Sequence, residues 1–302
     1  MPGTRRPSVV PVRDGLASRW LASMSLVAVL AAPGCAGRIA PTGPAARPDL
    51  FSATVPLRGR PFDVHLSAPA SPVDPDVLVL YGSGDGGWFG AAVDMFRDIA
   101  ATGRFTVGIS ARAFLRVEES GGGSTTPGQV AEDYQAIIQG AERRLGLAPT
   151  TRVVLTGWSR GAAFAVLAGE DRRLQSTLAG LVLIGLPEEE DLRVRSDADR
   201  GPGAVGERAD THRIRFDAYD ALPRLDRFRC ALIQSTGDDY LPASEARGHF
   251  GPDTATRRFY SVTADNHRFS GGRPAFNAAL RDALAWVSAS TTPAGAMQEP
   301  RR

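Results

Sequence analysis

The chain has no lysine and only two cysteines, and the shortage of cysteine excludes some kinds of site. All 35 basic residues are arginine, which we attribute to a GC-rich coding bias rather than to a functional choice. Cys35 and Cys230 cannot form a disulfide framework or a thiolate metal site. We read Cys230 as a small buried hydrophobic residue, and we expect neither a metal nor a cofactor.

The amino-terminal apolar run, residues 21–32, is too short to cross a membrane, which takes about 20 apolar residues. Four arginines precede it, and small residues lead from it to Cys35. This pattern predicts a secretory signal over residues 1–35, of bacterial lipoprotein type. We therefore expect an exported, periplasmic or otherwise extracytoplasmic protein attached to a membrane through a lipidated Cys35. Ordinary signal cleavage nearby is the alternative.

The basic character of the full chain comes from that signal. Removing residues 1–35 takes away four arginines and one aspartate, so that 31 basic and 32 acidic residues remain. Nucleic-acid binding needs a basic surface on the folded part, so no nucleic-acid partner is expected.

The length of 302 residues suits one α/β domain. Residues 36–50 are rich in proline, alanine and glycine and predict a flexible tether, whereas residues 291–302 predict a disordered tail. The domain is expected over residues 51–290. Its charged segment 187–219 predicts an excursion over the site, with a short ribbon near residues 211–219, or else a solvated surface loop.

Apolar runs alternate with segments of helical periodicity in this domain. Strands are predicted at residues 62–68, 77–82, 105–110, 152–157, 180–185, 230–236 and 257–263. Helices are predicted at residues 88–103, 126–146, 162–168 and 275–289. This alternation predicts an α/β-hydrolase-like fold, a mostly parallel, doubly wound sheet with helices on both faces and its sites at the carboxyl ends of the strands.

The stretch RVVLTGWSRGAAFAVLAG, residues 152–169, places Ser159 between Gly157 and Gly161 where a predicted strand turns into a helix. The bare pattern G-x-S-x-G arises by chance in many chains, and glycine and serine are ordinary turn residues. The strand before the serine and the helix after it are typical of a nucleophile elbow, which predicts Ser159 as a nucleophile.

A serine nucleophile needs a base and an acid. His267 follows the last predicted strand in a polar, glycine-flanked loop, whereas His65, His212 and His249 have structural explanations in a strand, in the excursion and at a helix end. Asp238 follows the preceding strand and completes the order Ser159, Asp238, His267, which is the order of α/β-hydrolases. Its neighbour Asp239 stays open as the alternative acid.

An oxyanion site is needed as well. We expect one donor to be the amide of Arg160, directly after the nucleophile, and the other to come from the loop GSGDGGWFG, residues 82–90. The candidates in that loop are Gly84, Asp85 and Gly86. The loop lacks the lysine and the serine or threonine of a P-loop, which disfavours a phosphate cradle.

Several stretches between residues 76 and 286 resemble the VirJ/AcvB group of virulence proteins within the α/β-hydrolase superfamily. They are VLVLYGSGDGGWFGAAVDMFRDIA (77–100), ARAFLR (111–116) with TPGQVAEDYQAII (126–138), GWSRGA (157–162) and NHRFSGG (266–272). The resemblance implies a bacterial, exported serine hydrolase that cleaves carboxylic esters, among them aminoacyl esters of phosphatidylglycerol. The acidic run at residues 188–191 would then meet a cationic aminoacyl group, or be a solvated charge run.

Two other functions stay open from the sequence. The same resemblance includes proteins linked to secretion assemblies, so a non-catalytic periplasmic accessory or binding protein is one alternative. A small-molecule esterase without a membrane substrate is the other. The sequence does not indicate the oligomeric state, nor whether residues 187–219 form a lid.

Overall fold

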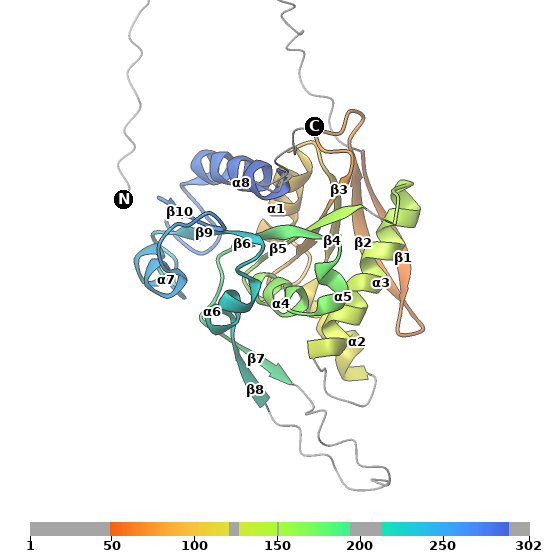
Figure 1. The fold of residues 1–302 in the computed structure, drawn as a ribbon, viewed down its shortest axis with the longest axis horizontal. Coiled ribbons are helices and arrows are strands. Elements are labelled where there is room, and N and C mark those ends of the chain that lie inside the picture. Colours follow the sequence, from red (N-terminus) through yellow and green to blue (C-terminus); the bar gives the residue numbers. More distant parts are fainter. Residues whose placement is uncertain (1–48, 121–126, 150, 194–212, 290–302) are drawn as a thin grey trace, which may run out of the picture. The chain divides into compact units, whose positions relative to one another are not determined.

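The structure, a computed structural model, describes residues 49–120, 127–149, 151–193 and 213–289 (Figure 1). The strands are β1 (Asp49–Leu57), β2 (Arg60–Ala68), β3 (Val77–Gly82), β4 (Phe105–Ile109), β5 (Arg152–Trp158), β6 (Leu178–Ile184), β7 (Glu189–Arg193), β8 (Arg213–Asp217), β9 (Arg229–Ser235) and β10 (Arg257–Val262). The helices are α1 (Ala91–Ala100), α2 (Ala111–Ser120), α3 (Pro127–Leu145), α4 (Arg160–Gly169), α5 (Arg172–Gln175), α6 (Ala218–Ala221), the 3₁₀ turn η2 (Leu222–Leu225), α7 (Ala243–Phe250) and α8 (Arg273–Ser288).

Eight of these strands form one sheet in the order β1-β2-β4-β3-β5-β6-β9-β10. The six strands from β4 to β10 are parallel, while β2 runs antiparallel to β4 and β1 antiparallel to β2. The predicted fold class, α/β with a mostly parallel sheet, is therefore confirmed. Because the central strands are parallel, the loops that follow β3, β5, β9 and β10 all emerge at one edge of the sheet.

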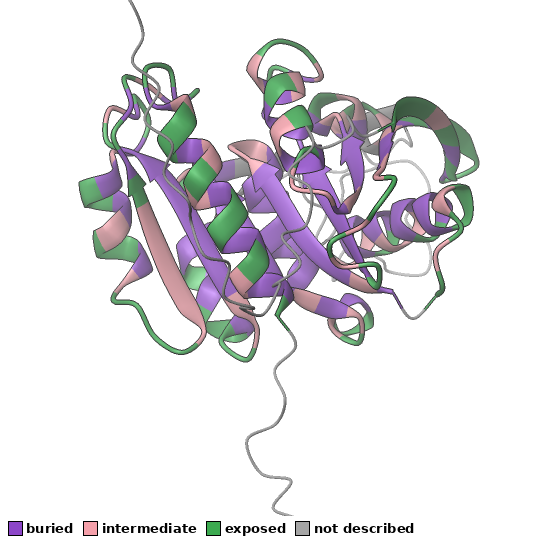
Figure 2. Cartoon of the chain, turned by 90° about the horizontal axis from the view of Figure 1, so that it is seen from above, coloured by how far each residue is buried: buried purple, intermediate pink, exposed green. Residues whose placement is uncertain are grey.

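Alternation along the central strands divides the core into two layers. In β3, Leu78 and Leu80 join a cluster with α3 and α4, whereas Val77, Val79 and Tyr81 join a second cluster with α1 and α8. Successive side chains of a strand point to opposite faces, so a strand that is apolar throughout is covered on both sides. Figure 1 shows α1 and α8 on one side of the sheet and α3 and α4 on the other, and Figure 2 shows the buried strands between helices whose outer faces are exposed.

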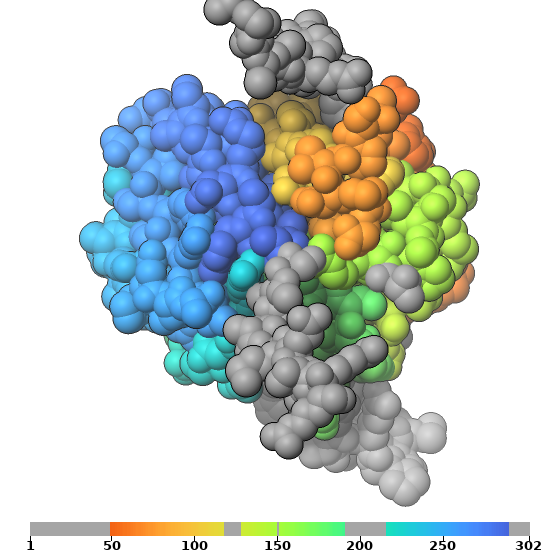
Figure 3. Space-filling view, turned by 45° about the horizontal axis from the view of Figure 1, so that its top comes forward, coloured from red at the N-terminus to blue at the C-terminus, as the bar shows by residue number. Residues whose placement is uncertain are grey.

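Segments far apart in the chain meet near the amino-terminal ends of β3 and β5. The side chain of Arg152 donates to the Asp76 carboxylate (3.1 Å) and to the Ser288 carbonyl (3.0 Å), which connects the start of β3 with the end of α8. Figure 3 shows the carboxyl-terminal part of the domain, in blue, directly beside the earlier segment in orange. Across the described residues, no helix combines the length and apolarity that a bilayer span requires.

Each of the seven strands predicted from the sequence matches a strand of the large sheet to within two residues at either end. The edge strand β1 was not predicted, and it begins at Asp49, inside the segment expected to be a tether. Within the predicted excursion, β7 pairs antiparallel with β8 in a separate ribbon. The predicted signal, most of the tether, His212 and the tail 291–302 lie outside the described residues.

Candidate active site

Ser159 occupies the turn between β5 and α4 in a conformation that few residues adopt. Its φ is 57° and its ψ is −125°, so it is one of three non-glycine residues with positive φ in the described part of the chain. Such a conformation costs of order 1–3 kcal/mol and is found mainly at functional sites. The turn leaves Ser159 half-buried at the start of α4, where the side chain lines a pocket.

The two glycines around this serine are required by close backbone contacts. A Cβ on Gly157 would lie 2.1 Å from the carbonyl carbon of Gly161, and a Cβ on Gly161 would lie 2.2 Å from the carbonyl oxygen of Gly82. No side chain fits at these distances, so β3, β5 and α4 meet here only because all three residues are glycine. The elbow therefore lies directly against the glycine-rich loop that follows β3.

Asp238 and His267 are in contact beside this elbow. The Nδ1 atom of His267 lies 2.7 Å from Oδ2 of Asp238, and both residues are buried. The same carboxylate oxygen accepts a hydrogen bond from Nε2 of Gln234 (3.0 Å), while Oδ1 accepts from the amides of Tyr240 (2.9 Å) and Leu241 (3.4 Å). Four donors therefore hold the carboxylate in place beside the imidazole.

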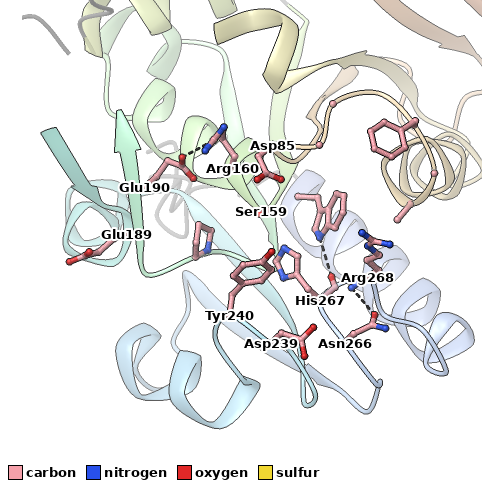
Figure 4. Close-up of a pocket in the computed structure, with 17 residues that line it drawn as sticks. Asp85, Ser159, Arg160, Glu189, Glu190, Asp239, Tyr240, Asn266, His267 and Arg268 are labelled. Atoms are coloured by element: carbon pink, nitrogen blue, oxygen red, sulfur yellow. Dashed lines mark hydrogen bonds and ion pairs between the residues drawn. The ribbon is translucent and has the colours of Figure 1, made fainter. Parts of the chain in front are cut away.

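The imidazole of His267 has its second nitrogen unused. Because Nδ1 donates to the carboxylate, Nε2 of a neutral ring carries the lone pair of a base. That Nε2 atom is buried and has no hydrogen-bond partner among the described residues. Trp158 fixes the backbone here, since its Nε1 donates to the carbonyl of His267 (3.1 Å), and Figure 4 shows the imidazole beside Ser159.

The remaining candidates for base and acid lie elsewhere. Asp239 is exposed on the pocket wall, whereas His267 forms its carboxylate hydrogen bond with Asp238. His65 in β2 stacks on Trp88 with ring centroids 4.0 Å apart, and burial lowers its pKa. His249 is exposed on α7, 3.8 Å from Glu188.

The glycine-rich loop after β3 borders the nucleophile. A Cβ on Gly84 would lie 3.4 Å from Cβ of Ser159, so this residue contacts the elbow, whereas Asp85 and Gly86 line the pocket. Among the described residues, the amides of Gly84, Asp85 and Gly86 find no acceptor. Trp88 anchors the loop between His65 and Phe96, with ring centroids 4.0 and 5.1 Å away.

The pocket around Ser159 and His267 has a volume of about 680 Å³ and is lined by more acidic than basic side chains (Figure 4). Its ionisable lining residues, other than His267 and Tyr240, are Asp85, Arg160, Glu189, Glu190, Asp239 and Arg268. Nε of Arg160 donates to the buried carboxylate of Glu190 (2.6 Å), which joins the start of α4 to the ribbon strand β7.

Sequence reasoning did not identify several residues of this pocket, among them Phe89, Trp158, Tyr240 and Arg268. Each lies within or next to a motif that the sequence did identify. Whether its side chain points into the pocket depends on the turn that follows a strand. No cluster of possible metal ligands occurs in the described part of the chain. Cys35 lies outside it.

Comparison with known proteins agrees with this architecture. An esterase domain from Rhodothermus marinus is 19% identical with a TM-score of 0.50 over 80% of this chain and 98% of its own. Est1E from Butyrivibrio proteoclasticus is 11% identical with a TM-score of 0.53 over 79% and 99%. A Xanthomonas campestris protein described as an α/β serine hydrolase without lid is 15% identical with a TM-score of 0.50 over 84% and 100%.

At these identities the three structures establish the fold and no more. A search of curated protein sequences found no match. The model of one protein family, described as bacterial virulence protein (VirJ), matches residues 76–250, from β3 through the elbow and Asp238 to α7. The chain therefore belongs to the VirJ family and has the α/β-hydrolase fold.

Proposed function

We propose that this protein is a serine hydrolase that cleaves carboxylic esters with Ser159, His267 and Asp238. The observation that carries the proposal is the pair of His267 and Asp238, 2.7 Å apart, with a free Nε2 atom on the pocket that also holds Ser159. A buried imidazole whose one nitrogen is fixed by a carboxylate is suited to take a proton from a serine hydroxyl.

We propose the following reaction for these residues. Oγ of Ser159 attacks the ester carbonyl and passes its proton to Nε2 of His267, while Asp238 stabilises the imidazolium. The amide of Arg160 and an amide of the loop at Gly84–Gly86 stabilise the oxyanion, each by roughly 3–4 kcal/mol. When the acyl–oxygen bond breaks, His267 returns the proton to the alcohol. Water then hydrolyses the acyl-serine in the same way.

Labelling with a fluorophosphonate probe tests the nucleophile. The wild-type protein is expected to label at Ser159, and Ser159→Ala should abolish both labelling and hydrolysis of a short soluble ester. Ser244→Ala, on an exposed residue of α7 that does not line the pocket, serves as the control and should label normally. Equal labelling of Ser159→Ala and wild type would disprove the assignment. An unlabelled protein whose biological phenotype survives Ser159→Ala would support the non-catalytic accessory instead.

We further propose that the substrate is a membrane lipid ester, preferably an aminoacylated phosphatidylglycerol, reached by an enzyme attached through a lipidated Cys35. The resemblance to the VirJ/AcvB group supports this substrate. The acidic side chains of Asp85, Glu189 and Asp239 on the pocket suit a cationic aminoacyl group. A tether of about 15 residues would keep the domain within roughly 20 Å of the headgroups.

Lipid extracts from a deletion strain test the substrate directly, because an accumulated aminoacyl lipid would identify it. With the purified protein, we expect a preference for aminoacyl lipid in vesicles over short soluble esters. Cys35→Ser should weaken that preference and leave soluble-ester turnover intact. Equal turnover of both substrate types, with or without the anchor, would favour a small-molecule esterase.

A further inference from the structure

The residue after His267 is a cation of the pocket for which the described residues supply no carboxylate partner. Arg268 lines the same pocket as Ser159, and its side chain is exposed. Over the described residues, its guanidinium makes no ion pair, whereas the other arginine of the pocket, Arg160, is paired with Glu190. An unpaired guanidinium offers a planar set of donors that matches phosphate and carboxylate oxygens.

The turn that carries Arg268 is held by hydrogen bonds and contains a strained backbone conformation. The side chain of Asn266 accepts hydrogen bonds from the amides of Arg268 (2.9 Å) and Ser270 (3.3 Å), and its carbonyl accepts from the amide of Phe269 (3.0 Å). Phe269 has a φ of 60°, which is strained for an aromatic residue, and its fully buried ring packs on Phe276 with centroids 4.6 Å apart. His267 and Phe269 are thus fixed inside the protein, and Arg268 between them is directed outward.

Strain of this kind occurs elsewhere in the described chain at only two non-glycine residues, Ser159 and Arg58. One is the proposed nucleophile, and the other lies in the turn that joins β1 to β2. A strained turn persists only where the surrounding structure holds it, and such turns concentrate at functional sites. The strained turn at Phe269 therefore points to a role for the residues that it orients.

Arg268 lies apart from the other arginine of the pocket. Figure 4 shows Arg268 on one side of Ser159 and His267, with the ion pair of Arg160 and Glu190 on the other side. In the proposed mechanism His267 returns its proton to the leaving alcohol, so the alcohol portion of the ester must lie close to this histidine. Arg268 lines the same pocket as His267, so its guanidinium faces the cavity that the alcohol portion would occupy.

We propose that Arg268 forms a subsite for an anionic group, a phosphate or a carboxylate, on the alcohol portion of the ester. The proposal rests on ester hydrolysis at Ser159 and adds a requirement to it. Esters whose alcohol carries a negative charge should react faster than uncharged esters of the same acid. The anion can belong to a soluble ester or to a lipid headgroup, because the guanidinium recognises the same oxygen atoms in both.

The test compares 1-butyrylglycerol 3-phosphate with 1-butyrylglycerol, which share the scissile ester and differ in one phosphate. For the wild-type protein we expect the higher kcat/KM with the phosphorylated ester, mainly through a lower KM. Arg268→Ala should lower kcat/KM for this ester about tenfold and leave the uncharged ester unchanged, as expected for the loss of a hydrogen bond to a charged group. Arg268→Lys should restore part of the loss.

Arg281→Ala is the matched control, because it removes an exposed arginine of α8 that does not line the pocket. An equal loss with both esters in Arg268→Ala would mean that Arg268 only supports His267, and no loss would mean that it has no role. Either result overturns the subsite. A loss seen only with anionic phospholipid vesicles, and not with the soluble phosphorylated ester, would overturn it in favour of surface attraction.

A second measurement separates failure of the subsite from failure of the proposed hydrolysis. Glycerol 3-phosphate, the alcohol that the phosphorylated ester would release, can be titrated calorimetrically into the wild-type protein. Binding that is about tenfold weaker in Arg268→Ala, and unchanged in Arg281→Ala, supports the subsite even if neither ester is hydrolysed. Hydrolysis of both esters without any such difference in binding or in kcat/KM would uphold the hydrolase and reject the subsite.

Discussion

Asp238 and Asp239 are neighbours in the chain with opposite surroundings. Asp238 is buried and receives four hydrogen bonds, including that of His267, while Asp239 is exposed. The sequence favoured Asp238, since the resemblance to hydrolases implies an aliphatic residue and a proline three and four places after the acid, here Leu241 and Pro242, but it left the choice open. What separates the two is the turn at Tyr240 and Leu241, whose amides point at one carboxylate only.

Asp238→Asn is expected to lower kcat by up to about 10⁴-fold, because an amide leaves the imidazole in the wrong tautomer and does not stabilise its cation. Asp239→Asn should change kcat far less. Turnover of a soluble ester by the two variants, with folding checked by circular dichroism, measures the difference. A large loss in Asp239→Asn together with an active Asp238→Asn would reassign the acid.

At the scale of elements, the strands were the easiest part to predict. The apolar runs of β3, β5, β6 and β9 are covered on both faces, so composition alone reveals them. The edge strand β1 is mostly exposed and lacks a clear alternation, and only its pairing with β2 makes it a strand. Which side chains point into the pocket depends on the geometry of the turns after the strands, and hydrophobic periodicity does not predict that geometry.

The position of the loop after β3 depends on space for the indole of Trp88, which the absence of a side chain at Gly108 provides. A Cβ on Gly108 of β4 would lie 2.2 Å from Cη2 of Trp88 and 2.7 Å from Cδ2 of Phe96. Gly108→Ala should therefore displace the indole, lower the free energy of unfolding by about 1–3 kcal/mol and reduce ester turnover through the loop. Urea unfolding followed by tryptophan fluorescence, with parallel activity assays, measures both effects.

Gly248→Ala is the control for that substitution. It lies in α7, where an added Cβ meets nothing within 4 Å, and alanine favours a helix over glycine by about 1 kcal/mol. This variant should be as stable as wild type or more stable, with unchanged turnover. If Gly108→Ala were as stable and as active as Gly248→Ala, the packing of Trp88 would not require glycine at position 108.

Unfolding of the whole molecule can be measured by chemical labelling of Cys230. This residue lies in β9, is 4% exposed, and burial raises the pKa of its thiol to about 12. A thiol reacts with iodoacetamide as the thiolate, so at pH 8 Cys230 of the folded protein should remain unlabelled. In Cys35→Ser, which leaves Cys230 as the single thiol, labelling is expected to rise with urea in parallel with the loss of tryptophan fluorescence. Labelling in the native baseline would show that β9 opens locally.

The proposed triad also has a consequence for how the protein gains activity as it folds. Ser159 follows β5, Asp238 follows β9 and His267 follows β10, and β6 separates the first strand from the other two. Parallel strands pair only after the intervening chain has crossed over, which makes such contacts slow to form. A chain still being synthesised has no partial site, because the base enters only after the last strand of the sheet. Activity should be the last native property to appear.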